Sequence, residues 1–228
     1  MSDAKSGLRL SGTEPAVERW QSMGVSDVAT VITADSGPGT FVIAVDGRSG
    51  GGKSTFAASL AGTLDAALLS TDDFAWWHSM FDWTDVIIEH GLGPLREGHE
   101  VDFRPPAWIE RGREGSISAP ARRFVVVEGV GAGQVRMRPA VDTVVWIQSD
   151  EVEAERRGLD RDLVERPDPT DAKRFWDSWM DQEGPFQEVQ QTWRVASLIV
   201  CGTPGVLGLD PAPGWLCAPG PAAGGRWA

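Results

Sequence analysis

The apolar residues of this chain are concentrated in short uninterrupted runs, separated by longer stretches of mixed character. Five such runs occupy residues 41–46, 67–71, 124–127, 143–147 and 196–201. Short apolar runs without alternating polar residues are typical of strands that are buried on both faces, as in parallel sheets. The pattern therefore predicts an α/β fold with a five-stranded parallel sheet flanked by helices.

Helical periodicity fills most of the intervals between these runs. It predicts helices over about residues 53–62, 84–90, 151–165 and 170–193. A weaker apolar pattern over 15–33 predicts a helix that is interrupted near Gly24, because glycine lowers the stability of a helix interior.

Three segments lack such periodicity. Residues 1–14 are polar and are expected to form a flexible N-terminal tail. Residues 94–122 are rich in Gly, Pro, Arg and Glu, and we expect an irregular excursion outside the sheet. Residues 204–228 are dominated by Pro, Gly and Ala and are expected to be a poorly ordered tail. The predicted domain therefore spans residues 15–203.

Composition narrows the classes of partner. The 228 residues suit one α/β domain, and the formal net charge of −12 argues against nucleic acid polymers and anionic membrane surfaces. No apolar run approaches the roughly 18 residues of a membrane span, and the polar N-terminus predicts no signal peptide. Cys201 and Cys217 are too few for a disulfide framework or a zinc site. These features predict a cytoplasmic protein, with self-association left open.

The segment Gly47–Ser54 fits the pattern G-x-x-x-x-G-K-[ST], and it directly follows the first apolar run. Glycines let the backbone bend so that successive N–H groups point at a phosphate chain. In such loops the lysine, here Lys53, reaches the outer phosphates, and the Ser54 hydroxyl ligates magnesium. The candidate nucleotide-binding residues are Gly47, Ser49, Gly50, Gly51, Gly52, Lys53, Ser54 and Thr55.

The alternative to a nucleotide site is a chance match in a glycine-rich chain. From average composition such a match is expected on the order of once in a hundred chains of this kind, and the preceding strand makes it rarer. Lys53 is also one of only three lysines in the chain. The sequence contains no asparagine, so it cannot supply the Asn-Lys-x-Asp loop that selects guanine.

Three carboxylates are predicted at the same edge of the sheet as this loop. Asp72 and Asp73 follow the second apolar run, and Glu128 ends the third. Ligands of open parallel sheets bind at the carboxyl ends of the strands. There a carboxylate can accept the proton of an attacking hydroxyl, and another can orient magnesium. The candidate metal ligands are Ser54, Glu128 and Asp72, whereas helix capping is the alternative role for the Asp pair.

The predicted helix 151–165 carries a cluster of arginines: Arg156, Arg157, Arg161 and Arg166. Arg157 and Arg161 are four residues apart and share a face of that helix. One reading is a solvated helix in which Glu153 pairs with Arg157. The other is a mobile lid over about residues 151–169 that closes its arginines over the transferring phosphate. In the second case Arg157 and Arg161 are catalytic residues, together with Lys53 and Asp72.

A group of aromatic residues directly follows the Asp pair: Trp76, Trp77, Phe81 and Trp83. Tryptophan faces can sandwich a planar ring such as a nucleobase. Ordinary core packing is the alternative, and the sequence does not distinguish which residues would serve which role.

With these motifs the chain resembles the uridine kinase-like branch of the P-loop kinases. Four segments carry the resemblance in the family's order: 45–55 (VDGRSGGGKST), 69–74 (LSTDDF), 128–129 (EG), and 155–162 with its ERR and RD pairs. A weaker similarity lies at 95–101 (LREGHEV). The resemblance implies the three-layer P-loop NTPase fold with a lid helix, and ATP and Mg²⁺ as cofactors.

The resemblance also implies roles for individual residues. Asp72 would be the base for the acceptor hydroxyl, Glu128 would help to hold magnesium, and arginines among Arg156, Arg157 and Arg161 would contact phosphate. The acceptor side departs from the family, because Ala75 stands where a tyrosine is usual after the Asp-x-Phe step. The family's Pro-x-Tyr-Asp-type acceptor segment likewise has no clear counterpart at 102–108.

The leading hypothesis is a magnesium-dependent kinase that moves the γ-phosphoryl group of ATP to a hydroxyl of a small molecule. A nucleoside such as uridine or cytidine is the first candidate acceptor. A vitamin precursor, a sugar phosphate or an antibiotic is the alternative within kinases. A regulatory module that senses ATP without transferring phosphate is the alternative outside enzymes.

Overall fold

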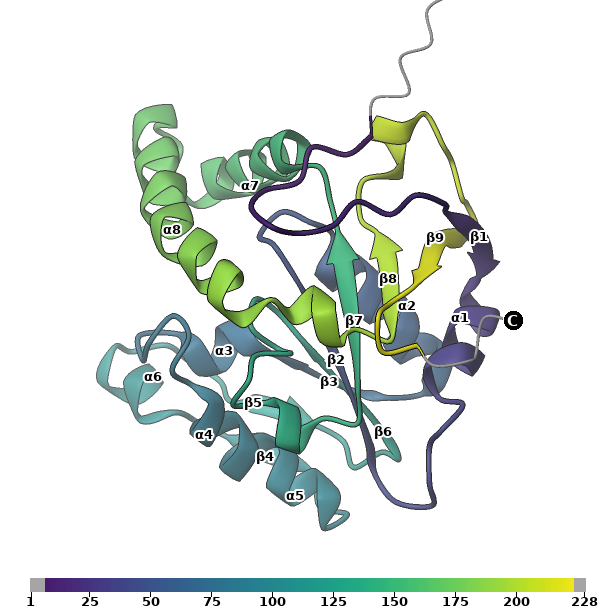
Figure 1. The fold of residues 1–228 in the computed structure, drawn as a ribbon. Coiled ribbons are helices and arrows are strands. Elements are labelled where there is room, and N and C mark those ends of the chain that lie inside the picture. The colour runs from purple at the N-terminus through teal and green to yellow at the C-terminus, as the bar shows by residue number, and fades with distance from the viewer. Residues whose placement is uncertain (1–6, 224–228) are drawn as a thin grey trace, which may run out of the picture.

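A computed structural model describes residues 7–223 of the chain. Its centre is a seven-stranded sheet in the order β1-β9-β8-β7-β2-β6-β3 (Figure 1). Five neighbouring strands are parallel: β8 (Leu198–Cys201), β7 (Thr143–Gln148), β2 (Phe41–Gly47), β6 (Phe124–Glu128) and β3 (Ala67–Ser70). These are the five apolar runs, and the predicted α/β class with a parallel sheet flanked by helices is confirmed.

Both faces of the sheet are covered by a hydrophobic core, and the side chains of β2 alternate between the two cores. Phe41, Ile43 and Val45 face a core that includes residues of α1 (Val25–Ile32) and α2 (Lys53–Leu64). Val42 and Ala44 face the other core, built around Trp83, Ile87, Leu92, Leu95 and Trp108. Because β2 is apolar on both faces, it is buried along its whole length.

The two remaining strands correct the sequence-based expectations at both ends of the chain. Residues 21–24 form β1 (Gln21–Gly24) rather than part of a helix, and α1 begins only at Val25. Residues 214–219, expected in a disordered tail, form β9 (Gly214–Pro219), which pairs antiparallel with both β8 and β1. Both strands are short, and β1 and β9 lie nearly 200 residues apart in sequence, so local periodicity carries little sign of them.

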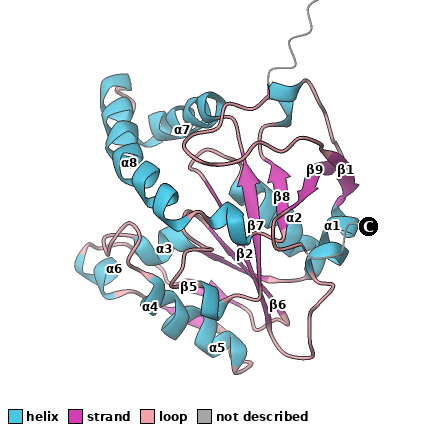
Figure 2. Cartoon of the chain, viewed as in Figure 1, coloured by secondary structure: helices cyan, strands magenta, loops and turns pink. Residues whose placement is uncertain are grey.

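The excursion between β3 and β6 is more regular than its composition suggests. It contains α3 (Thr71–Ala75), α4 (Thr84–Ile87), a π-helical turn (Ile88–Leu92), α5 (Gly93–Arg96) and α6 (Pro106–Glu110). A separate two-stranded sheet joins β4 (Val101–Phe103) to β5 (Ile117–Ala119). The helical expectation for 84–90 is confirmed, and the segment 94–122 lies outside the main sheet as expected (Figure 2).

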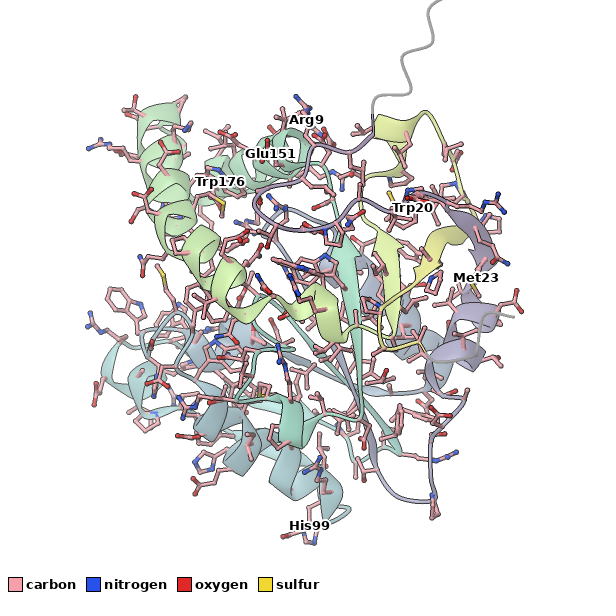
Figure 3. The ribbon with its side chains drawn as sticks, viewed as in Figure 1. Arg9, Trp20, Met23, His99, Glu151 and Trp176 are labelled. Carbon is pink, nitrogen blue, oxygen red and sulfur yellow. The ribbon has the colours of Figure 1, made fainter. Side chains whose placement is uncertain are left out.

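Two helices form a hairpin above the carboxyl ends of β7 and β8. They are α7 (Glu151–Glu165) and α8 (Pro169–Gln190), at the predicted positions. Trp176 of α8 points toward α7 in Figure 3 and packs on Gly158, where an added Cβ would collide with the indole ring. Gly158 therefore lets the two helices approach closely at this contact. No helix of the described residues is long and apolar enough to cross a membrane.

Replacing Gly158 with alanine is expected to destabilise the protein by about 1–3 kcal/mol, because the added methyl group overpacks the contact with Trp176. The matched control is Gly184→Ala in the interior of α8, where a Cβ would meet nothing within 4 Å. That control is expected to gain about 0.5–1 kcal/mol from helix propensity. Urea unfolding of both variants measures the difference, and equal effects at the two positions would contradict the packing argument.

The N-terminal segment is bound to the body of the protein from residue 7 onward, which corrects the expected flexible tail; residues 1–6 lie outside the described residues. Arg9 makes a double ion pair with Asp150, the N-cap of α7, with an Nη2–Oδ1 distance of 2.9 Å. Figure 3 shows Arg9 above the start of α7, beside Glu151. Glu14 is buried and accepts hydrogen bonds from Trp146 and Gln148 of β7. Polar side chains, rather than an apolar run, thus hold this segment in place.

Candidate active site

The centre of the parallel sheet supplies the position for a ligand. β2 lies between β6 and β7, and the chain leaves β2 toward β3 on one side before it later returns to β7 on the other. Ligands of doubly wound sheets bind where the connections diverge in this way, outside the carboxyl ends of the strands. The predicted phosphate loop, residues 47–54, starts at the last residue of β2 and runs into the first turn of α2.

Glycines shape this loop at two positions in particular. Gly50 and Gly52 have φ values of 71° and 97°, which side-chain-bearing residues rarely adopt. A Cβ on Gly50 would also collide with the carbonyl oxygen of Ala154 in α7. The loop is packed closely against the start of α7, so its backbone geometry is fixed from outside. A backbone of this kind can present N–H groups to an anion.

Helix α2 begins with two polar residues of the motif, Lys53 and Ser54. The Ser54 hydroxyl lies 3.2 Å from Glu128 Oε2. Lys53 is buried, with 8% of its surface exposed, and its Nζ donates to the carbonyl of Arg48 at 2.9 Å. Ser54 and its neighbour Thr55 are exposed. The motif thus folds into a compact loop with a buried lysine and an exposed serine, whose hydroxyl lies beside Glu128.

Glu128 lies at the end of β6, opposite Val45 of β2, and is buried. Burial raises its pKa, and the charge of Asp72 acts in the same direction. Lys53 and hydrogen bonds from Ser54 and Ser70 oppose this shift. The charges of Lys53 and Asp72 therefore both act on Glu128, in opposite directions.

The neighbouring acids Asp72 and Asp73 have different surroundings. Asp73 Oδ1 accepts a hydrogen bond from Arg113 at 2.7 Å, and the Arg113 guanidinium stacks on Trp108 at 3.5 Å from the ring centroid. Asp72 is exposed at the first turn of α3 and acts electrostatically on Glu128. Asp73 is therefore part of the support of α3 and α6, and Asp72 stays the predicted acid of the site.

A further acid, Asp46, was not singled out from the sequence. It is buried in the otherwise apolar strand β2, directly before the loop. Its carboxylate accepts N–H bonds from Gly47, Gly131 and Gly133 at 2.7–3.0 Å. Burial raises its pKa, while these N–H donors and Lys53 act against the shift. Asp46 thus ties the phosphate loop to the loop that follows Glu128, and a charged residue inside a buried strand was the signal that could have revealed it.

Replacing Asp46 with asparagine is expected to lower stability by about 1–3 kcal/mol, because an amide group would then face an N–H donor inside the protein. The matched control is Asp142→Asn, since Asp142 is exposed and one of its oxygens accepts a single N–H bond, from Val42. That variant should be nearly as stable as the wild type. Thermal unfolding of both proteins measures the difference; an Asp46 variant as stable as the control would exclude this role.

The two predicted lid arginines, Arg157 and Arg161, make different contacts. Arg157 Nη1 donates to the carbonyl of Gly202 at 2.8 Å and lies 3.8 Å from the position of a Cβ on Gly52, so Arg157 borders the phosphate loop. Its Nε bonds to Glu153. Arg161 pairs instead with the adjacent Asp162. The helix of the lid is therefore present, and it brings Arg157 to the loop; a catalytic role for either arginine stays a prediction.

The aromatic residues after the Asp pair serve different purposes. Trp83 is fully buried in the core, whereas Trp77 is exposed and carries the Arg111 guanidinium 3.9 Å from its ring centroid. Phe81 stacks on Phe186 of α8 with 3.9 Å between centroids. Trp76 makes edge contacts with Trp77 and Trp108. Core packing thus explains Trp83, and a pocket role for the other three stays a prediction.

Helix α8 contributes a group at the loop that sequence reasoning missed. Glu183 is buried and accepts the backbone N–H of Ser49 at 2.9 Å. Trp179 Nε1 donates to both Ser49 Oγ and Glu183. The spacing of Trp176, Trp179 and Glu183, which places all three on one helical face, was the available signal.

The side chains present fit a magnesium–phosphate group. Magnesium is usually bound by one or two protein oxygen ligands, with phosphates and water completing its coordination. Ser54 and Glu128 supply two such oxygens 3.2 Å apart, and Asp72 adds a nearby negative charge. Within residues 7–223, no group of three or more His, Cys, Asp or Glu is arranged to hold a metal on its own. The donor set therefore suits magnesium bound together with phosphate.

Comparisons with known proteins give similarity only at the level of structure: no family model and no curated protein sequence matches the chain. One similar structure is a "putative fructose transport system kinase" from Silicibacter sp. TM1040, with 18% identity and a TM-score of 0.49 over 66% of this chain and 86% of that one. Another is a "possible uridine kinase" from Bacillus stearothermophilus, with 17% identity and a TM-score of 0.44 over 72% and 93%. A third, the YGR205w protein, has 11% identity and a TM-score of 0.49 over 79% and 94%.

Proposed function

We propose that this chain is a kinase that transfers the γ-phosphoryl group of ATP to a hydroxyl group of a small molecule, with magnesium as its cofactor. The observation that carries this proposal is the meeting of a phosphate loop with Lys53, Ser54 and Glu128 at the carboxyl ends of β2 and β6. Phosphoryl transfer needs little covalent chemistry from a protein. It depends mainly on positioning and on neutralising charge, and this edge of the sheet supplies groups of both kinds.

On the donor side, the N–H groups of residues 49–54 would bind the phosphate chain, and the Lys53 ammonium would move from the Arg48 carbonyl to the outer phosphates. Ser54 and Glu128 would hold the magnesium ion, with Asp72 nearby. When bound, magnesium bridges phosphate oxygens and offsets their negative charge. Arg157, which already borders the loop, would stabilise charge that develops during transfer. Arg161 is proposed to join it when the lid closes.

On the acceptor side, Asp72 would accept the proton of the attacking hydroxyl as the new oxygen–phosphorus bond forms and ADP leaves. A base must reach that hydroxyl directly or through one water molecule. Asp72 suits this role because it is exposed at the start of α3, whereas Asp73 is already paired with Arg113. The cytoplasm, where ATP and magnesium are abundant, is the proposed location.

A nucleoside such as uridine or cytidine is the first candidate acceptor. Trp76, Trp77 and Phe81 lie in the segment that follows Asp72, and aromatic faces of this kind bind planar rings. The sequence of this segment departs from that of nucleoside kinases, so a non-nucleoside metabolite or an antibiotic is the second candidate within the same activity.

The proposal is tested by measuring ADP release from MgATP in the presence of nucleosides and, separately, of sugars, vitamin precursors and aminoglycosides. A kinase releases ADP faster when its acceptor is added, and the acceptor gains the phosphate. A regulatory module that senses ATP would show no stimulation by any hydroxyl compound, and this result across the whole panel would contradict the proposed transfer.

A further inference from the structure

The contact between α8 and the phosphate loop is not explained by any motif of the sequence. Glu183 is 2% exposed. Its Oε1 accepts hydrogen bonds from Ser49 N–H and Gln187 Nε2, both at 2.9 Å, and its Oε2 accepts one from Trp179 Nε1 at 2.5 Å. A buried carboxylate is costly unless it is hydrogen-bonded, and here one of its three donors is a backbone N–H of the loop itself.

The Ser49 N–H is the donor that a bound phosphate chain would also need. The N–H groups of such a loop bind phosphate because they converge on one anion. A carboxylate and a phosphate oxygen are both anionic acceptors, and two anions that share one donor repel each other strongly when they are shielded from water. The carboxylate of Glu183 and a phosphate oxygen therefore exclude each other at Ser49.

Helix α8 has a weak point directly after Glu183. Gly184 and Pro185 follow it inside the helix. Proline lacks an N–H group and interrupts the helical hydrogen bonds, and glycine adds backbone freedom. A Cβ on Gly184 would meet nothing within 4 Å, so this side of the helix is open. A local bend of α8 at Gly184 and Pro185 would let Glu183 withdraw from the loop without unfolding of the whole helix.

We propose that Glu183 is an internal competitor of nucleotide phosphate: it binds the phosphate loop through Ser49, and nucleotide binding displaces it together with this part of α8. This inference rests on the proposed function, because it concerns the same loop. It makes the affinity for ATP the outcome of a competition between the phosphate chain and a side chain of the protein.

The test is calorimetric titration of the full chain with MgATP, and separately with magnesium tripolyphosphate. If Glu183 holds the loop about nine-tenths of the time, its removal should tighten apparent binding roughly tenfold. Glu183→Gln removes the charge and is expected to bind both probes about tenfold more tightly than the wild type. The matched control is Glu188→Gln, which removes a charge five residues further along α8, where Glu188 bonds to Thr13. Its affinity for both probes should equal that of the wild type.

A second variant keeps the test valid if the Glu183 variant does not fold. Trp179→Phe keeps the carboxylate but removes an indole N–H that holds it, so it should tighten binding in the same direction by a smaller factor. Hydrogen exchange of the wild type should also become faster over residues 180–190 when MgATP is added. Binding by the wild type that needs Lys53 but is unchanged or weaker in both variants would overturn this inference alone. Failure of every protein to bind either probe would overturn the proposed function with it.

Discussion

Replacing Lys53 with alanine is expected to reduce kcat by about a thousandfold, which is the scale seen when one preorganised charge-stabilising donor is removed from an active site. Lys53 is the only lysine at the phosphate loop among the described residues, and no other ammonium is placed to reach the same phosphates. Its present contact, with the carbonyl of Arg48, is local to the loop. The variant should therefore lose turnover, and its melting curve measures the effect of removing a positive charge that acts on Asp46 and Glu128.

The matched control is Lys173→Ala. Lys173 is exposed on α8 and pairs with Asp177 and Glu155 on the surface. Exposed pairs of this kind contribute little to stability, so this variant should keep both its melting temperature and its turnover. ADP release in a coupled assay measures the two variants. Turnover of the Lys53 variant within a few-fold of the wild type would show that the loop does not bind the transferred phosphate.

The second large effect is expected for Asp72→Asn, which should lower kcat by about 10²–10⁴-fold, the usual contribution of general acid–base catalysis. Asparagine has nearly the same shape but cannot accept a proton at neutral pH. Because Asp72 lies at the edge of the site, on the exposed first turn of α3, MgATP should still bind to the variant. Loss of turnover with retained nucleotide affinity is the result that identifies a base for the acceptor.

Asp73→Asn is the control for this variant. Asp73 bonds to Arg113, and an asparagine oxygen can accept the same N–H bond, so only a small change in turnover is expected. The pair of variants thus distinguishes the roles of Asp72 and Asp73, which the sequence alone could not do. Equal losses at both positions, or a fully active Asp72 variant, would contradict the assignment of the base.

The parallel sheet could be predicted because its five strands are short apolar runs, and burial on both faces leaves a strong signal in the sequence. The glycine loop, Asp72 and Glu128 were predicted for a related reason. Each follows or ends one of those strands, so the topology alone brings them to one edge of the sheet. The structure places the Ser54 hydroxyl 3.2 Å from Glu128, and the charges of Lys53 and Asp72 both act on that carboxylate.

The missed features depend on contacts between distant parts of the chain. Strand β9 pairs with β1 across nearly 200 residues, and neither strand has the periodicity that marks a buried element. Glu14, Asp46 and Glu183 are buried acids whose partners come from other elements. The sequence does not distinguish an acid that will be buried from one that will be exposed, because its hydrogen-bond donors come from distant residues. The supporting contacts of the site therefore became visible only in the folded chain.

The central claim is that the glycine loop, Lys53, Ser54 and the acids at 72 and 128 surround one magnesium–triphosphate. A crystal structure of the protein with Mg²⁺ and a non-hydrolysable ATP analogue tests this most directly. We expect the β- and γ-phosphates within hydrogen-bond distance of the loop N–H groups and Lys53 Nζ, and the metal at the Ser54 hydroxyl on the side of Glu128. A nucleotide bound elsewhere on the protein, or a metal bound away from Ser54 and both acids, would contradict the account.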